Sequence, residues 1–456
     1  MSLKSEITEN IGVPPVDLRD VRIGGGVRSS LIEVIDGLPA SGTVAVLTDA
    51  SVYRTATDDD VKGTILDALR ASRAVVHVVL PGEVHADEVT VEAAVAGCHE
   101  ADVVVTIGSG TLCDIGKVAA GNRPHIVVQS AASVNGFADD QSVLLINGVK
   151  RTTHSGWPHT LLIDNEILAG APATLNRSGL GDMISMFTAP ADWYLAAQFQ
   201  MDRGFRKNFA VMTRRYGDSL LDIASGVGSS EPESLTTLAE FVTLSGISMG
   251  AAGQTSPSSG MEHTVSHLID MANGSNGASN ALHGEQVGVA TVLVSLLWRR
   301  MAARLADRSI GALAVPDAEF AEAAVRKAFT WMDENGATAD ECWRDYSAKR
   351  SHLESVDAAG LRATLVNTWP THAAELDEML VAPERIVAAL TAAGAPTRFR
   401  DLSQPIDRDT VVWAMTNCHL MRNRFTIADL AYLTGHWSDS DVEAVIAEAD
   451  ALGAGL

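Results

Sequence analysis

The chain has 456 residues, of which 46% are hydrophobic and 20% are charged, as expected for a globular protein with a large core. Its net charge of −23 argues against nucleic acid as a partner, because a polyphosphate requires a basic surface. No apolar run has signal-peptide length at the N-terminus, and none reaches about 18 residues elsewhere. The four cysteines form no CxxC pair and are too few for a disulfide scaffold. We therefore expect a reduced cytoplasmic protein without a membrane partner.

Short β-branched runs alternate with helical patterns over the first third of the chain. This alternation is typical of buried parallel strands connected by helices. It predicts an α/β, Rossmann-like nucleotide-binding domain over residues 1–170. The expected strands are Val44–Leu47, Val75–Leu80, Val103–Ile107, Ile126–Val128 and Leu161–Ile163; helices are expected over Val89–Ala101 and from Asp114 to Ala119, and a hairpin should pair Ser142–Ile146 with Gly148–Thr153 around Asn147-Gly148.

Helical periodicity replaces the strand-like runs after Pro172. We place the domain boundary near Ala169–Thr174 and expect an all-α domain over residues 171–456. Loops rich in Gly, Ser and Asn, at Gly253–Gly260 and Asn273–Asn280, should flank one short helix. The expected helices are Asp182–Gln200, Leu235–Gly250, Glu262–Met271, Gly284–Arg300, Glu319–Glu334 and Ser438–Ala451.

Two small-residue motifs follow predicted strands in the first domain. Gly108-Ser109-Gly110-Thr111 ends a strand and opens a helix, so backbone N–H groups and the helix dipole could approach a pyrophosphate. The motif is neither GxGxxG nor a Walker loop, and a tight turn without a ligand is an equal alternative. Ser130–Ser133 lie where such sheets bind ligands, although helix-capping serines would explain them as well.

Histidines in the helical half have the spacing of metal ligands. His263 and His267 share one helix face, and a loop could bring His283 back beside His263. Together with Asp182, His263 and His283 would suit a catalytic divalent ion with an open coordination position. A histidine pair on a helix is nevertheless more often a surface or core feature than a ligand pair, and Asp182 alone is simply a good residue for a helix N-terminus.

The order of these motifs resembles the superfamily of glycerol dehydrogenases, iron-dependent alcohol dehydrogenases and dehydroquinate synthases. Between Gly108 and Gly288 the chain is most similar to the glycerol-1-phosphate dehydrogenase family. The resemblance implies a dehydroquinate synthase-like fold, NAD or alternatively NADP, and one divalent ion: Zn²⁺ or Ni²⁺, with Fe²⁺ as a further option. The implied reaction interconverts sn-glycerol 1-phosphate and dihydroxyacetone phosphate. The similar segments are GSGTLCDIGK, SAASVNGFADD, GVKRT, SGLGDMISMFTAPADW, SGMEHTVSH and ALHGEQVGV.

The resemblance also assigns residues to each part of the site. Asp182, His263 and His283 match the metal ligands, Asp182 and His267 match catalytic residues, and Asn135, Asp182 and His267 would contact the substrate. Relatives often have an Asp in place of Asn135 and a Ser or Thr in place of Asp139, which leaves the exact polyol open. The implied cofactor-binding residues are Gly108, Ser109, Gly110, Thr111 and Leu112 at the pyrophosphate, Ser130, Ala131, Ala132 and Ser133 at the nicotinamide, and Asp139.

Asp49 ends the first strand, where a carboxylate could bind the adenosine ribose and repel a 2′-phosphate. We therefore expect NAD to be preferred over NADP, although Asp49 could equally cap the next segment. Lys150 and Arg151 are candidate ligands of the substrate phosphate, or form a solvated basic turn.

Three other functions are alternatives to a glycerol-1-phosphate dehydrogenase: a glycerol dehydrogenase, a dehydroquinate-synthase-like lyase and a non-catalytic NAD-binding protein. For each enzyme we expect a small substrate and a homo-oligomer, and we assign no role to the long segment after Ala302.

Overall fold

The computed structural model describes residues 16–82, 84–146 and 149–456, without the side chains of residues 149, 150 and 210–216. The chain forms two compact units, one with the residues up to 183 and 222–254, the other with 184–221 and 255–456. Helix α7 (Ala173–Ile184) runs through the point of division. The predicted boundary between residues 170 and 171 lies just before this helix.

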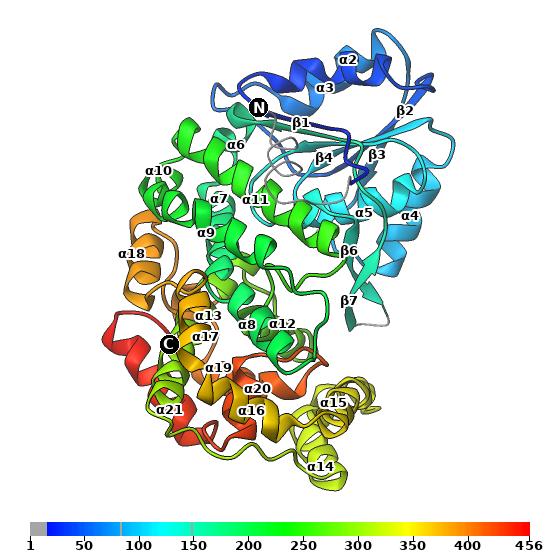
Figure 1. Ribbon diagram of the computed structural model, residues 1–456. Helices are drawn as coiled ribbons and strands as arrows, with labels where there is room; N and C mark the ends of the chain where they lie inside the picture. The colour runs from blue at the N-terminus through cyan, green and yellow to red at the C-terminus, as the bar shows by residue number, and fades with distance from the viewer. Residues whose placement is uncertain (1–15, 83, 147–148) are drawn as a thin grey trace. The chain divides into compact units, whose positions relative to one another are not determined.

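A six-stranded parallel sheet forms the centre of the first unit, in the order β1-β8-β5-β4-β2-β3 (Figure 1). All five predicted strands are present, and the predicted fold class, an α/β part followed by a largely helical part, is confirmed. The sequence did not reveal β1, because this short edge strand is only half-buried and carries charged residues. The strands are β1 (Asp20–Gly24), β2 (Thr43–Asp49), β3 (Ala74–Leu80), β4 (Val103–Gly108), β5 (His125–Gln129) and β8 (Thr160–Asp164).

Both faces of this sheet are apolar, which explains why its central strands are continuous hydrophobic runs. Val44 and Val46 of β2 belong to one hydrophobic cluster, whereas Ala45 and Leu47 belong to another, as the two-residue period of a strand requires. Helices cover both faces (Figure 1). The first cluster includes residues of α2 (Leu31–Asp36) and α3 (Val61–Arg70), and the second includes residues of α4 (Glu88–Cys98) and α5 (Gly110–Ala120).

The predicted hairpin is also present in the first unit. Strands β6 (Gln141–Ile146) and β7 (Val149–His154) pair antiparallel, while the predicted turn at Asn147-Gly148 lies outside the described residues. The shorter elements of this unit are η1 (Val27–Ser30), η2 (Gly136–Ala138), α6 (Asn165–Gly170) and α10 (Ala224–Gly228).

Helix α11 (Pro232–Ala252) belongs to the first unit although it comes late in the sequence. Among the described residues it is the one helix long and apolar enough to cross a membrane, but 67% of the relevant window is buried in the protein. Its glycines allow close packing: a Cβ at Gly246 would overlap the carbonyl oxygen of Asn135, and one at Gly250 would overlap the ring of Trp157. We therefore interpret α11 as a core helix.

The second unit is helical. The predicted helices at 262–271, 284–300, 319–334 and 438–451 are confirmed, with shifted ends. The prediction of one helix over Asp182–Gln200 is wrong, because the chain leaves helical geometry at Thr188 and Pro190 starts a new helix. The elements are η3 (Ser185–Phe187), α8 (Ala189–Gln198), α9 (Lys207–Asp222), α12 (Met261–Ser275), α13 (His283–Ala306), α14 (Ala318–Phe329), η4 (Thr330–Met332), α15 (Ala337–Ser355), α16 (Ala358–Asn367), α17 (Trp369–Asp377), α18 (Pro383–Ala393), η5 (Phe399–Asp401), α19 (Arg408–Asn417), η6 (Cys418–Leu420), α20 (Ile427–Leu433) and α21 (Asp439–Ala451).

We predict that Gly179→Ala lowers the free energy of unfolding by roughly 1–3 kcal/mol, because a Cβ there would overlap the backbone of Ala132 in the loop after β5. The measurement is a denaturant titration. Gly274→Ala in α12 is the matched control: no atom lies within 4 Å of its new Cβ, so it should be neutral or stabilise by up to about 1 kcal/mol. Equal effects of the two substitutions would contradict this prediction.

Candidate functional site

The carboxyl ends of β2 and β4 mark the point where the strand order reverses. The chain passes from β2 to β3 on one side, then returns to place β4 on the other side of β2. Open parallel sheets bind ligands outside such a switch point. Gly108 ends β4 there, and α5 begins at Gly110, one turn earlier than predicted. A Cβ on Gly110 would come within 2.6 Å of the Val134 side chain, so a glycine is required for this close turn.

Asp49, at the end of β2, has a cationic partner that the sequence did not indicate. Lys62 Nζ donates to Asp49 Oδ1 at 2.8 Å and lies 4.0 Å from the centre of the Tyr53 ring. The Ser51 backbone N–H also donates to Asp49, at 3.0 Å. Burial alone would raise the pKa of Asp49, but hydrogen bonds from Lys62 and Tyr53 outweigh it and hold the pKa below its usual range. The carboxylate is therefore ionised, and its charge is balanced locally.

The loop after β5 contains the residues predicted to line the nicotinamide. Ser130 N–H donates to the carbonyl oxygen of Gly108 at 2.9 Å, which joins this loop to the glycine turn. Asn176 of α7 accepts from the Ala132 N–H at 3.1 Å. The loop residues 130–133 are buried. The two predicted cofactor segments thus lie together, while their cofactor contacts stay predictions.

Asp139 lies in a buried ion pair. Lys117 Nζ donates to Asp139 Oδ1 at 2.9 Å and to the carbonyl oxygen of Gly136 at 2.6 Å, and pairs with Asp114 at 3.2 Å. Burial raises the pKa of Asp139 to about 6, and Lys117 opposes that rise. The contacts hold the segment around η2 in place. These bonds do not test whether Asp139 contacts the cofactor, which stays a prediction.

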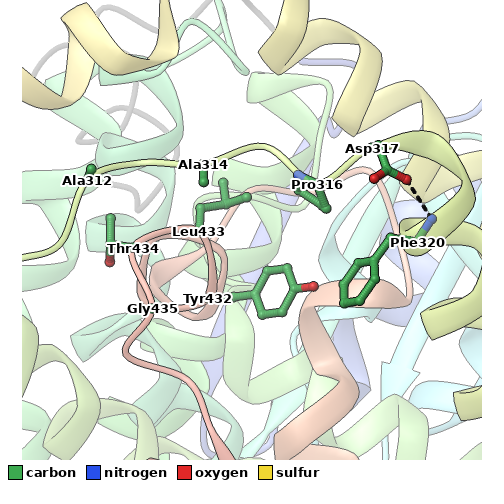
Figure 2. Close-up of a pocket in the computed structure, with 9 residues that line it drawn as sticks. All are labelled: Ala312, Ala314, Pro316, Asp317, Phe320, Tyr432, Leu433, Thr434 and Gly435. Atoms are coloured by element: carbon green, nitrogen blue, oxygen red, sulfur yellow. Dashed lines mark hydrogen bonds between the residues drawn. The ribbon is translucent and has the colours of Figure 1, made fainter.

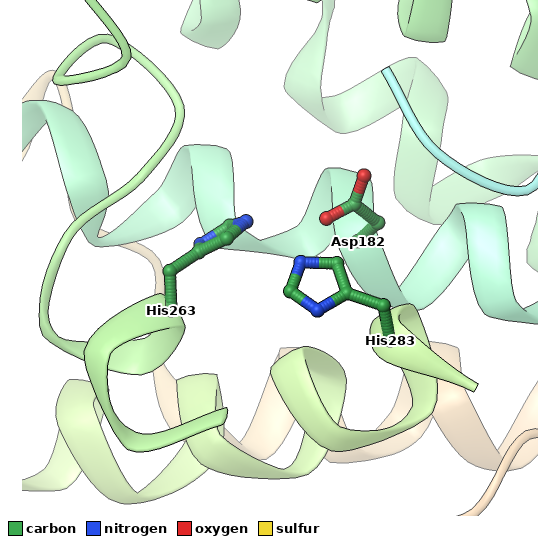
Figure 3. Close-up of side chains that lie close together, drawn as sticks. All are labelled: Asp182, His263 and His283. Atoms are coloured by element: carbon green, nitrogen blue, oxygen red, sulfur yellow. The ribbon is translucent and has the colours of Figure 1, made fainter. Parts of the chain in front are cut away.

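Asp182, His263 and His283 form a group suited to a metal ion (Figure 3). Each residue offers one ligand atom, and the three atoms lie within 4.8 Å of one another. Asp182 is in the last turn of α7, His263 in the first turn of α12, and His283 is the first residue of α13. Two imidazoles and one carboxylate are a donor set for Zn²⁺, Ni²⁺ or Fe²⁺.

The hydrogen bonds of His263 fix which nitrogen can bind a metal. Its Nδ1 lies 3.0 Å from Glu262 Oε1, a buried carboxylate that can only accept here, so the ring proton is on Nδ1. Glu262 is held in turn by the N–H of Gly260 at 2.6 Å and the hydroxyl of Thr188 at 2.9 Å. Nε2 is therefore the ring nitrogen that carries no proton, and the carboxylate makes the ring a better ligand.

A longer chain of contacts orients His283. Gln286 Nε2 donates to Asp270 at 2.8 Å, so its Oε1 is an acceptor, 3.2 Å from the Ser266 hydroxyl. Because Ser266 donates to Gln286, its oxygen accepts from His283 Nδ1, at 3.2 Å. In the neutral ring of His283, as in that of His263, Nε2 is thus the nitrogen that carries no proton. Gln286 thus orients His283 through Ser266, a role that the sequence did not indicate.

His267 and Asn135 lie beside this group. The His267 ring centre is 5.6 Å from that of His283 and 6.3 Å from that of His263. The Asn135 backbone N–H donates to Asp182 Oδ2 at 3.3 Å, and its side chain donates to Ser245 at 3.1 Å. Their predicted roles at the substrate are consistent with these positions and stay predictions.

Two further residues of the second unit were not indicated by local patterns. Asp192 is fully buried and accepts from the Met261 N–H at 2.8 Å, the Ile427 N–H at 3.0 Å and the Trp298 indole at 3.1 Å. Burial, and then the nearby Glu262 carboxylate, raise the pKa of Asp192. The second residue, Arg422, donates from Nη2 to His267 Nδ1 at 2.7 Å. Arg151 is on β7, and the side chain of Lys150 lies outside the described residues.

The second unit also contains an open cavity of about 460 Å³ (Figure 2). Its polar side chains include Asp317, whose carboxylate accepts from the Phe320 N–H at 2.8 Å and caps α14. No predicted site residue lines the cavity, and no histidine does. Its lining is Ala312, Ala314, Pro316, Asp317, Phe320, Tyr432, Leu433, Thr434 and Gly435.

Known proteins resemble this chain in sequence. A family model described as iron-containing alcohol dehydrogenase matches residues 22–172. A Bacillus licheniformis protein named glycerol-1-phosphate dehydrogenase [NAD(P)+] is 32% identical over 48% of this chain, and the match spans 55% of that protein's length. A Methanosarcina barkeri protein of the same name is 28% identical over 64% of this chain and 81% of its own length.

Solved structures share the fold. A glycerol dehydrogenase from Schizosaccharomyces pombe has a TM-score of 0.57 at 14% identity, over 95% of this chain and 90% of that one. A maleylacetate reductase from Rhizobium sp. strain MTP-10005 has a TM-score of 0.55 at 17% identity, over 96% and 97%. At this identity the likeness concerns the fold alone. The sequence matches and the fold together confirm the resemblance inferred from the motifs.

We predict that Glu262→Gln weakens Zn²⁺ binding roughly 10–100-fold, because it removes the negative charge that makes His263 a strong ligand while keeping the side-chain size. Competition with a chelator measures the affinity. The exposed Glu233→Gln on α11 is the matched control and should leave the affinity unchanged. An unaltered affinity in Glu262→Gln would count against His263 as a ligand.

A second substitution tests the predicted ribose site. Lys62→Met removes the cation that balances Asp49, so the carboxylate should repel a 2′-phosphate more strongly. We predict that the ratio of kcat/KM for NAD over NADP rises about tenfold, or by about 1.4 kcal/mol. Lys327→Met, at an exposed position of α14, is the control. If the ratio does not move, the ribose does not bind near Asp49.

Proposed function

We propose that the chain is a metal-dependent, NAD(P)-linked oxidoreductase acting on sn-glycerol 1-phosphate and dihydroxyacetone phosphate, because its first unit matches the iron-containing alcohol dehydrogenase family and its relatives are named glycerol-1-phosphate dehydrogenase. The observation that carries the proposal is the group of Asp182, His263 and His283, in which both imidazoles are held through Nδ1. A divalent ion bound there would supply Lewis acidity toward a hydroxyl or carbonyl oxygen, and a nicotinamide would exchange the hydride.

The neighbouring residues are suited to binding the substrate. His267 Nδ1 accepts a hydrogen bond from Arg422, so the proton of the neutral ring is on Nε2. We propose that the His267 Nε2–H donates a hydrogen bond to the reacting oxygen of the substrate, and that Asn135 orients the substrate. Asn135 is well placed for this, since its backbone already donates to Asp182.

Cofactor use follows from the charges around Asp49. The Asp49 carboxylate would by itself favour NAD, as the sequence predicts, but Lys62 compensates its charge in the structure. We therefore propose that the enzyme prefers NAD and also accepts NADP. The two relatives are named as NAD(P)+ enzymes, which supports this proposal.

The identity of the substrate rests on these relatives and on the charge of the chain. A protein with a net charge of −23 attracts a dianion poorly, so a phosphate must be bound by short-range donors. Short contacts are screened less than surface charges. The proposed phosphate is therefore compatible with the acidic composition only if a local cation contributes.

We predict that kcat/KM for glycerol 1-phosphate exceeds that for glycerol at least about 100-fold, equivalent to about 2.7 kcal/mol and within the reach of one or two charge-assisted hydrogen bonds. The assay follows NADH formation by the metal-loaded protein. Comparable efficiencies would identify a glycerol dehydrogenase instead. Turnover of a carboxylated sugar phosphate without net NADH would identify a synthase-like lyase.

A further inference from the structure

The second unit places a guanidinium directly beside the metal-binding histidines. Arg422 lies between η6 and α20, and its Nη2 donates to His267 Nδ1 at 2.7 Å. The His267 ring packs against those of His263 and His283. The guanidinium is thus one imidazole away from the proposed ion.

The backbone on both sides of Arg422 is held by one buried lysine. Lys349 Nζ, from α15, donates to the carbonyl oxygens of His419 at 2.6 Å and Arg424 at 3.1 Å. It also pairs with the Asp429 carboxylate of α20 at 2.6 Å. The lysine side chain is 1% exposed, so these three bonds are shielded from solvent. They fix the segment that presents Arg422.

Arg424 holds the same segment by bonds to the loop before α12, whereas Arg422 contacts His267. Its guanidinium donates to Thr255 Oγ1 at 2.6 Å, to Ser259 Oγ at 2.7 Å and to the Ser259 carbonyl oxygen, all just before α12. Burial lowers its pKa below the usual arginine value. Arg424 thus ties its segment to the start of α12. Arg422, two residues earlier, reaches His267 on the same helix.

We propose that Arg422 binds the phosphate group of the substrate, an inference that rests on the proposed function. A guanidinium offers a planar fork of N–H donors that matches a phosphate, and it stays charged at every physiological pH. In glycerol 1-phosphate only three bonds separate the reacting carbon from phosphorus. A phosphate beside Arg422 therefore leaves the reacting carbon near the histidines.

This assignment gives a role to the long segment after Ala302. Helices α15 and α20 supply Lys349 and Asp429, which hold Arg422 against α12. In this protein the C-terminal helices would therefore determine whether a phosphorylated polyol is recognised, while the histidines serve a phosphorylated and a free polyol alike.

The test compares Arg422→Met and Arg422→Lys in the full-length, metal-loaded enzyme with NAD. We expect Arg422→Met to reduce the kcat/KM ratio of glycerol 1-phosphate over glycerol by about 30–100-fold, mainly through KM, and Arg422→Lys to give an intermediate ratio. Arg344→Met is the control, because this α15 arginine is 62% exposed and pairs with Glu341 on its own helix. It should keep the wild-type ratio.

A binding measurement separates this inference from the proposed function. Inorganic phosphate is titrated calorimetrically into the metal-loaded protein with NAD, and we expect Arg422→Met to weaken its binding at least about tenfold. An unchanged ratio with unchanged phosphate affinity would overturn the inference, as would an equal loss on both polyols. If the wild type prefers free glycerol, the proposed function fails, and the phosphate titration still decides whether Arg422 binds an anion.

Discussion

The hydrogen bonds at the buried start of helix α12 orient His263 and join several helices of the second unit. Two carboxylates meet there: Glu262 accepts from the Gly260 N–H and the His263 ring, and Asp192 accepts from the Met261 N–H. Anions are favoured at a helix N-terminus, where backbone N–H groups lack partners inside the helix. Because Asp192 also accepts from the Ile427 N–H, this point connects α8, α12 and α20. It fixes the His263 tautomer and the C-terminal segment together.

Local cations compensate for an acidic chain at the positions where the proposed ligands would bind. Lys62 balances Asp49 at the edge of the sheet, Lys117 neutralises the buried acids beneath the glycine turn, and Arg422 lies beside His267. The overall charge of −23 acts mainly through solvent and is screened by salt, whereas these contacts are shorter than 3 Å. The net charge is therefore compatible with a small phosphorylated substrate.

Close backbone packing positions the remaining ligand. Gly179 allows α7 to approach the loop after β5 so closely that Ala132 leaves no room for a side chain. The same helix carries Asp182 one turn later, and Asn176 one turn earlier bonds that loop. A single helix thus contacts the predicted nicotinamide loop and supplies a predicted metal ligand. This explains physically why the SGLGD segment has a glycine at position 179.

The sequence by itself determined five of the six strands described in the sheet, seven of the described α-helices and the candidate metal ligands, because strand and helix periodicities and the spacing of motifs are local. Only the tertiary structure revealed Lys62 beside Asp49, the tautomers set by Glu262 and Ser266, and Arg422 beside His267. Arg422 and His267 are 155 positions apart, and Asp192 and Ile427 are 235 apart. Contacts over such separations arise from packing and burial, and they leave no periodic trace in the chain that forms them.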